Sequence, residues 1–233
     1  MMRLLIATRN AHKVGEIRTI LGEEFRFLTL NDVPGAPEVV EDAGTFAGNA
    51  SKKAAELARW LWQSGSAVQE SAGGLYVLAD DSGLEVDALN GAPGVHSARF
   101  AALDTGQPGN SPTSQNNSKL LRLLEGIPPE KRTARFRCVL ALTRVPRSSP
   151  AAAPPVFLAA EPKCETELFE GICEGRIGFG AQGQGGFGYD PLFFPAGFDR
   201  TFAELGDAVK NRLSHRAKAL AKLHQFLIPG EVQ

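Results

Sequence analysis

The sequence predicts an α/β fold because apolar runs of strand length alternate with segments of helical periodicity. Residues 3–7 form the first apolar run, and after a polar turn apolar residues recur at helical spacing up to Gly22. Residues 134–195 are rich in strand patterns. This region therefore predicts a second lobe of antiparallel character.

Local signals predict the other elements. Thr45 is a suitable N-cap for a second helix that ends near residues 63–65, and Ser214 is one for a last helix that continues to about residue 227. A strand over 75–79 leads into an acidic turn, Asp80-Asp81-Ser82-Gly83. The remaining expectations are a half-exposed strand over 84–88, a loop over 106–117, a short helix over 118–124, a strand over 134–143, a Pro/Ala/Ser-rich connection over 147–155 and a hairpin strand over 164–173.

Composition excludes several classes of protein. Of the 233 residues 43% are hydrophobic and 22% are charged, and the net charge of −1 provides no basic field for a nucleic-acid polymer. The three cysteines, Cys138, Cys164 and Cys173, fit neither a zinc site nor a redox pair, and they favour a reducing, cytoplasmic setting. The sequence offers neither a signal peptide nor the roughly 18 apolar residues of a membrane span, so we expect no membrane association.

The first candidate site is the polar turn between the first strand and the first helix, residues 8–13. Backbone amides and the helix dipole favour an anion there, and Thr8, Asn10 and Lys13 add hydrogen bonds and a positive charge. A capped helix with a solvated lysine is the alternative.

The acidic turn is the second candidate. Adjacent carboxylates repel each other unless a cation or a donor lies nearby, and Mg²⁺ bound through carboxylates and phosphate oxygens is a natural partner for Asp80 and Asp81. A surface turn with glycine at its end is the alternative. Glu41 with Asp42 and Lys52 with Lys53 form a second acidic and a basic pair, which are more often solvated than functional.

Two further constellations lie in the second half of the chain. The glycine-rich loop 183–191 is not a dinucleotide fingerprint, because Pro191 stands where a helix would begin. It suits a flat ligand that stacks on Phe187 or Tyr189; a hairpin turn with core aromatics is the alternative. Near the carboxyl end, Lys210 precedes Ser214-His215-Arg216, whose two cations lie in a first helical turn where the dipole disfavours them. That departure indicates a site for an anion or for carbonyl acceptors.

Together, these motifs resemble the family of inosine/xanthosine triphosphate pyrophosphatases, also called Ham1-like. The matching stretches are ATRNAHK (7–13), TFAGNASKKA (45–54), ADDSGLEVDALNGAPGVHSARF (79–100), ARFRCVLAL (134–142), GGFGYDPLFF (185–194) and KNRLSHRAKAL (210–220). They extend over nearly the whole chain, and the combination of the 79–100 block with FGYDP and SHR is highly specific.

The resemblance implies a single domain over residues 1–233 with an elongated, two-lobed fold, a mixed central sheet flanked by helices and an active-site cleft between the lobes. It also implies a homodimer, a Mg²⁺ cofactor and hydrolysis of ITP, dITP or XTP to the monophosphate and pyrophosphate. Asp81 would be the proton acceptor and a metal ligand, and Glu41 a second metal ligand. The implied substrate-binding residues are Thr8, Arg9, Asn10, Ala11, His12, Lys13, Lys53, Ser82, Phe187, Gly188, Tyr189, Asp190, Lys210, His215 and Arg216.

Two positions depart from the family pattern. Arg9 stands where a small residue is common, and Gly48 where glutamate is frequent, so the phosphate contacts and the metal ligands are in question there. Two alternatives stay open: a pyrophosphatase for modified pyrimidine nucleotides, and a nucleotide-binding sensor without turnover.

Overall fold

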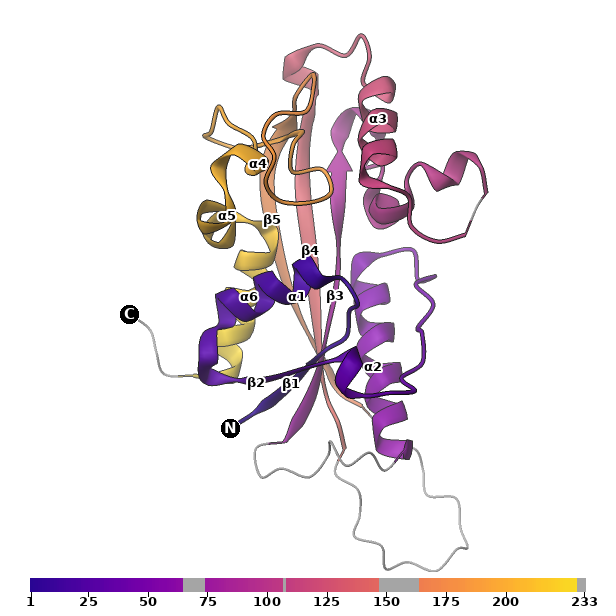
Figure 1. The fold of residues 1–233 in the computed structure, drawn as a ribbon, viewed down its shortest axis with the longest axis vertical. Coiled ribbons are helices and arrows are strands. Elements are labelled where there is room, and N and C mark those ends of the chain that lie inside the picture. Colours follow the sequence, from indigo (N-terminus) through magenta and orange to yellow (C-terminus); the bar gives the residue numbers. More distant parts are fainter. Residues whose placement is uncertain (65–73, 107, 147–163, 230–233) are drawn as a thin grey trace, which may run out of the picture. The chain divides into compact units, whose positions relative to one another are not determined.

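A computed structural model describes residues 1–64, 74–106, 108–146 and 164–229 of the chain (Figure 1). The chain divides into two compact units: unit 1 is residues 1–80 with 140–169, and unit 2 is residues 81–139 with 170–233. The connection predicted over 147–155 lies outside the described residues. No helix in the described part of the chain is long and apolar enough to cross a membrane.

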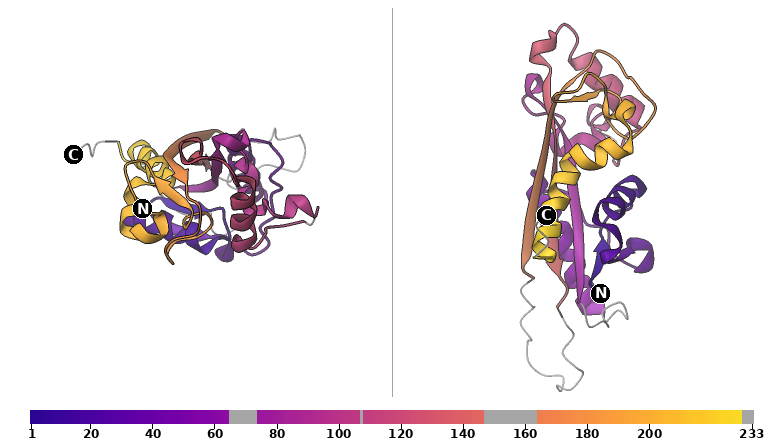
Figure 2. Two further views of the ribbon diagram at one scale, coloured as in Figure 1. Left: turned by 90° about the horizontal axis from the view of Figure 1, so that it is seen from above. Right: turned by 90° about the vertical axis from the view of Figure 1, so that its left-hand side faces the viewer.

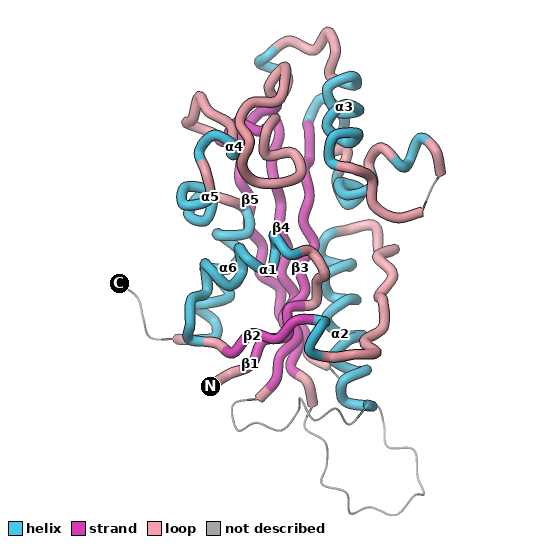
Figure 3. Tube along the Cα trace, in the orientation of Figure 1, coloured by secondary structure: helices cyan, strands magenta, loops and turns pink. Residues whose placement is uncertain are grey.

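The described strands, drawn in magenta in Figure 3, form one mixed sheet. The strand order is β2-β1-β3-β4-β5-β6. β1 pairs in parallel with β2 and β3, whereas β5 and β6 are antiparallel. The strand bounds are β1 Arg3–Ile6, β2 Arg26–Thr29, β3 Leu75–Val86, β4 Thr133–Arg144, β5 Thr166–Ile177 and β6 Phe193–Pro195. The predicted α/β class and the mixed sheet are confirmed.

The helices of unit 1 begin and end at the signals that the sequence carries. α1 (Ala11–Leu21) is capped by Asn10 and stops at Gly22, whose φ of 68° favours glycine. α2 (Phe46–Ser64) begins after Thr45, whose hydroxyl accepts a hydrogen bond from the Gly48 amide at 3.0 Å. The core of unit 1 includes the fully buried side chains of β1 and one face of α2.

Unit 2 contains the remaining helices, α3 (Thr113–Leu123), α4 (Phe202–Leu205), α5 (Asp207–Leu213) and α6 (His215–Leu227). The predicted cap of α6 is confirmed, because the Ser214 hydroxyl accepts a hydrogen bond from the Ala217 amide at 3.2 Å. Short 3-10 helices also occur at Gly22–Glu24, Leu30–Asp32, Asp87–Leu89, Gly94–Arg99, Ala102–Asp104 and Pro129–Lys131.

Two predicted elements are wrong. Asp80-Asp81-Ser82-Gly83 is not a turn, because β3 runs through it without interruption from Leu75 to Val86. The polar residues and the glycine predicted that the strand would end there. Instead, residues 79–84 are largely buried and the extended backbone continues. The loop predicted over 106–117 also ends early, since α3 begins at Thr113; its first turns are polar and lack an apolar stripe.

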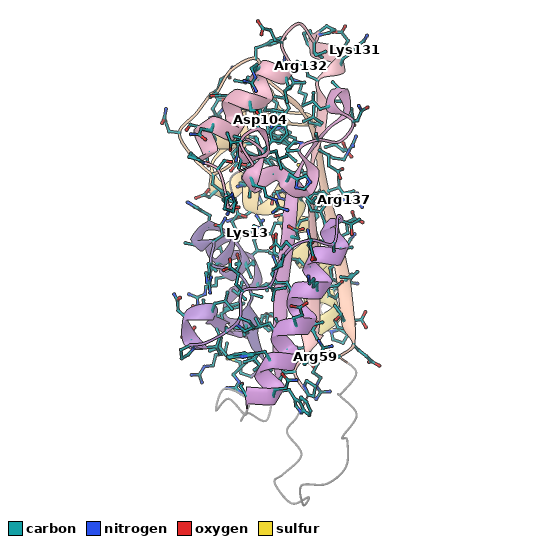
Figure 4. All side chains as sticks on the ribbon, turned by 90° about the vertical axis from the view of Figure 1, so that its right-hand side faces the viewer. Lys13, Arg59, Asp104, Lys131, Arg132 and Arg137 are labelled. Carbon is teal, nitrogen blue, oxygen red and sulfur yellow. The ribbon has the colours of Figure 1, made fainter. Side chains whose placement is uncertain are left out.

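A buried cation orders the end of unit 2 where β4 begins. Arg132, labelled in Figure 4, is 2% exposed and donates to the carbonyl oxygens of Leu124, Ile177 and Gly178 at 2.8, 3.0 and 2.6 Å. Burial lowers the pKa of the Arg132 guanidinium from its ordinary value. The three carbonyls compensate for the loss of water, so Arg132 contacts two backbone segments, one at Leu124 and one at Ile177–Gly178.

Asp87 gives unit 2 a pH-dependent contribution to stability. Hydrogen bonds from Thr133, at 2.6 Å, and then from Arg135 lower the pKa of the Asp87 carboxyl from its ordinary value. A carboxyl whose folded pKa is depressed stabilises the fold above its unfolded pKa of about 4, and the contribution is lost as the pH falls through the folded pKa.

We therefore expect Asp87→Asn to be less stable than the unmodified chain at pH 7, with a difference that shrinks below about pH 4. Urea unfolding of both proteins at several pH values measures it. A stability difference that stays constant down to pH 2 would contradict the assignment.

Candidate active site

The first cluster of predicted site residues lies where β1 leads into α1. Asn10 Oδ1 accepts hydrogen bonds from the amides of His12, at 3.0 Å, and Lys13, at 3.2 Å, while the Asn10 amide donates to Thr8 Oγ1 at 3.2 Å. The turn is thus fixed by its own side chains, and residues 9–12 at the amino end of α1 are exposed. Such a helix start favours an anion.

Two lysines contact Asp80, a β3 residue that lies beside this cluster. Lys13 Nζ lies 2.5 Å from Asp80 Oδ1, and the two side chains are 16% and 1% exposed. Lys53 Nζ donates to the Asp80 carbonyl at 3.1 Å and forms an ion pair with Glu41. Asp80 is therefore the carboxylate that holds Lys13 in place, which explains how a buried charge is tolerated here.

Arg9 contributes differently from its neighbours. Its guanidinium lies 3.9 Å from the Glu38 carboxylate, and the two side chains are 64% and 85% exposed. An exposed pair at this distance contributes little to stability. Arg9 is therefore available to a ligand at small cost, and its departure from the family pattern need not disturb the turn.

In unit 2, Asp81 and Ser82 continue β3 directly after Asp80. Asp81 is buried, and Ser82 Oγ accepts a hydrogen bond from Arg216 Nη2 at 2.9 Å. Arg216 and His215 are 1% and 4% exposed, and the His215 ring stacks on Phe136 with a centroid distance of 4.8 Å. Because successive side chains of a strand point to opposite faces, β3 separates the Asp80 and Asp81 carboxylates instead of leaving them side by side.

The glycine-rich loop of unit 2 forms a turn that is held by the Asp190 carboxylate. Asp190 Oδ2 accepts from the Phe187 amide at 2.7 Å and from Lys210 Nζ at 2.6 Å, and the Asp190 and Lys210 side chains are both 2% exposed. A Cβ on Gly186 would lie 2.2 Å from that oxygen, so glycine is required for the turn. Lys210 Nζ also lies 4.2 Å from the centroid of the Phe187 ring.

Among the aromatic candidates, the structure distinguishes Phe187 from Tyr189. Tyr189 is 4% exposed, its hydroxyl donates to the Ser97 carbonyl at 2.9 Å, and burial raises its pKa well above the ordinary value. It anchors the loop to the core of unit 2. Phe187 is half-buried and lies near two cations, with Arg216 at 6.0 Å from its ring centroid, so of the two rings it is the better surface for a flat ligand.

Ser97 and Asn117 support this cluster although the sequence did not single them out. Ser97 Oγ accepts from the Leu84 amide at 2.9 Å and donates to the Gly94 carbonyl. Asn117 Nδ2 donates to the Gly188 carbonyl at 3.2 Å. Asn117 was assigned to a loop, and only its position on α3 makes this contact predictable.

Glu41 in unit 1 and Asp81 in unit 2, the predicted metal ligands, are carboxylates, whose oxygens suit Mg²⁺ chemically. Within the described ranges, no group of three or more His, Cys, Asp or Glu side chains could hold a metal ion. Mg²⁺ commonly binds through one or two carboxylates and completes its shell with water and phosphate oxygens. The donors present therefore fit an ion that arrives with a phosphorylated ligand.

The protein thus has an α/β fold with two clusters of candidate site residues. One suits an anion and the other suits a flat ligand. A model of the Ham1 family matches residues 4–226. The chain is 45% identical to a dITP/XTP pyrophosphatase from Desulforamulus reducens over 97% of this chain and 96% of that protein. It is 43% identical to the enzyme of the same name from Shouchella clausii over 97% of both.

Solved structures agree with this likeness. A HAM1 protein from Coxiella burnetii superimposes with a TM-score of 0.75 at 33% identity and covers 99% of this chain and 100% of that chain. A nucleoside-triphosphatase, or dITP/XTP pyrophosphatase, from Mycobacterium abscessus has a TM-score of 0.66 at 37% identity, covering 95% and 98%. The chain belongs to the Ham1 family.

Proposed function

We propose that this chain hydrolyses the non-canonical purine nucleotides dITP, ITP and XTP to the nucleoside monophosphate and pyrophosphate. The observation that carries the proposal is the match over 97% of the chain to relatives named dITP/XTP pyrophosphatases. The two clusters support it, since Lys13, Lys53 and the start of α1 suit a triphosphate, and Phe187 with its cations suits a base. Asp80 belongs to the first cluster, and Asp81, the next residue in the chain, belongs to the second.

In the proposed mechanism water attacks the α-phosphorus and passes a proton to the Asp81 carboxylate. A new bond forms between the water oxygen and the α-phosphorus, and the bond from that phosphorus to the oxygen shared with the β-phosphate breaks. Pyrophosphate leaves, and the monophosphate keeps the water oxygen. Positioning and electrostatics dominate such phosphoryl transfers, and Lys13 and Lys53 hold the negative charge of the phosphates.

A divalent cation, Mg²⁺, would be held by Asp81, Glu41 and the phosphate oxygens, and would supply neutralisation of the leaving group's charge. Glu41 forms an ion pair with Lys53, so the carboxylate that would hold the ion lies beside a lysine that would bind the phosphates. As the resemblance implies, the enzyme would be a homodimer that works in the cytoplasm.

Selection of the base follows from the donors in unit 2. Hypoxanthine and xanthine present an oxygen at position 6, whereas adenine presents an amino group. Arg216 and His215 supply donors, so a 6-oxo base is satisfied and a 6-amino base leaves buried donors mispaired. Mispairing of this kind can lower the specificity constant by about 10⁴.

A nucleotide panel tests the proposal. Purified protein is incubated with ITP, dITP, XTP, ATP, GTP and a modified pyrimidine triphosphate, with and without Mg²⁺, and pyrophosphate and monophosphate are quantified. We expect equal amounts of the two products from ITP, dITP and XTP, little from ATP, and loss of turnover without the cation.

The other outcomes have defined meanings. Equal rates on ITP, ATP and GTP would contradict the recognition scheme, and release of orthophosphate would contradict attack at the α-phosphorus. Preference for the pyrimidine nucleotide would favour the first alternative. Binding of ITP without any product would identify a sensor.

A further inference from the structure

The outer edge of β5 is covered by a strand at one end and by a helix at the other. β6 pairs only with Gly175–Ile177, and the Ala196 amide donates to the Glu174 carbonyl at 2.8 Å. Carbonyls of alternate residues in a strand point to the same side, so those of Ile172 and Glu170 lie on the same edge, beyond the end of β6. They accept hydrogen bonds from Lys218 Nζ at 2.8 Å and Lys222 Nζ at 2.7 Å.

Both lysines belong to α6, which lies alongside β5 (Figure 2). They are four residues apart and therefore lie on one side of the helix. The helix thus protects the strand edge where β6 stops, and it is held against β5 at the carbonyls of two alternate residues, Glu170 and Ile172.

Gly171 lies between those two carbonyls and permits a very close approach. A Cβ at this position would lie 2.0 Å from the His215 carbonyl oxygen and 2.6 Å from the Ala219 amide nitrogen. Both atoms are helix backbone, which cannot rotate away as a side chain can, so any larger residue must displace α6. We call Gly171, Lys218 and Lys222 the α6 clamp.

The clamp acts on the first turn of α6, the same turn that carries His215 and Arg216. Gly171 faces the carbonyl of His215 itself. In the same turn, the His215 ring stacks on Phe136 and Arg216 donates to Ser82. The placement of two buried donors thus depends on how closely α6 approaches β5.

We propose that the α6 clamp sets the positions of His215 and Arg216 for the base of the nucleotide, and that Gly171 is a positioning residue of the reaction. This inference rests on the proposed function for its kinetic consequences. Gly171 and Lys218 touch neither substrate nor reacting atoms in this scheme, and they act only through α6.

Gly171→Ala with Gly175→Ala as a matched control tests the proposal. A Cβ at Gly175 would lie 2.3 Å from the Phe194 carbonyl oxygen and 2.6 Å from Phe193 Cζ, a similarly close approach on the same strand that involves β6 instead of α6. We expect both variants to lose stability in thermal unfolding. Gly171→Ala should also raise KM for ITP by about 10- to 100-fold, as a small misplacement of binding groups does, while Gly175→Ala stays within about threefold.

A second set of variants avoids the risk of misfolding. Lys218→Met keeps the length of the side chain but removes the donor, and we expect KM for ITP to rise by about three- to tenfold, the range of one hydrogen bond. Lys218→Arg retains a donor and should restore KM. Lys222→Met removes the donor one turn further from His215 and should have a smaller effect. Equal KM values in all of these variants and in Gly171→Ala would overturn the positioning role.

Hydrogen exchange separates failure of the clamp from failure of the proposed function. Amide exchange in the first turn of α6, at residues 217–218, should be faster in Gly171→Ala and Lys218→Met than in Gly175→Ala. This readout requires no turnover, so it applies even if the unmodified protein leaves ITP intact. Unchanged exchange in both α6-facing variants would overturn the clamp, whereas absence of ITP hydrolysis alone would overturn only the proposed function.

Discussion

Asp81→Asn is expected to lower the rate of pyrophosphate release from ITP by roughly 10²–10⁴-fold, the range that general-base catalysis supplies. Asparagine has almost the same size and can still accept a hydrogen bond, so the strand and its packing should persist. What is lost is the ability to take a proton from the attacking water. Because Asp81 is 6% exposed, the substitution also removes a buried negative charge.

The neighbouring carboxylate provides the matched control. Asp80→Asn changes the same functional group one residue earlier, but Asp80 is paired with Lys13 in unit 1. We expect this variant to affect KM more than kcat, because it loosens a lysine proposed to bind phosphate. Steady-state kinetics with ITP at saturating Mg²⁺ measure both. Near-normal kcat in Asp81→Asn would remove Asp81 from the role of base, and an equal loss of kcat in both variants would argue against a special role for either.

Asp190→Asn is expected to destabilise the protein by about 3–5 kcal/mol, the usual result of removing one partner of a buried ion pair. The carboxylate and Lys210 are each 2% exposed, and the same oxygen also accepts the Phe187 amide. The substitution leaves the Lys210 charge in a poorly solvated position without its carboxylate. It also weakens the turn that holds Phe187, so binding of ITP should fall together with stability.

An exposed pair provides the comparison. Asp104 pairs with Lys119 and Arg122, but its side chain is 51% exposed, so Asp104→Asn should cost far less stability than Asp190→Asn. Urea unfolding of the two variants measures the contrast. Adding Lys210→Met to Asp190→Asn should recover part of the loss, since no buried charge then remains in the pair. A loss in Asp190→Asn as small as that in Asp104→Asn would contradict the importance of this pair.

Several elements could be predicted because their signals are local. Thr45 and Ser214 cap the helices that they were expected to cap, and Gly22 ends the first helix. The interior of β3 was misjudged because its polar residues are satisfied by partners far away in the chain. Lys13 meets Asp80 across 67 residues, and Arg216 meets Ser82 across 134. A local pattern of acidic residues and glycine contains no information about such partners. From the sequence alone, the pattern therefore predicted a turn.

In the candidate site too, the residue types could be predicted from the sequence, whereas their long-range contacts could not. Residue types and the family resemblance indicated Phe187, Asp190 and Lys210, but not that one oxygen of Asp190 accepts from both of the others. The core position of Tyr189 and the support from Ser97 and Asn117 depend on tertiary contacts. The assignment of Asp81 and Glu41 to a metal, and of the full residue set to the substrate, stays a prediction.

One boundary between the two units falls between Asp80 and Asp81, and it limits how the chain can be divided into fragments. Each unit is built from two separate stretches of sequence, and β3, β4 and β5 each pass from one unit into the other. A fragment that ends at residue 80 would therefore lack part of its own unit and expose a strand broken in its middle. Neither unit can be expressed, exchanged or lost as a contiguous piece of the gene. Cutting the chain at the bond between the two aspartates would separate residues 1–80 of unit 1 from residues 140–169 of the same unit.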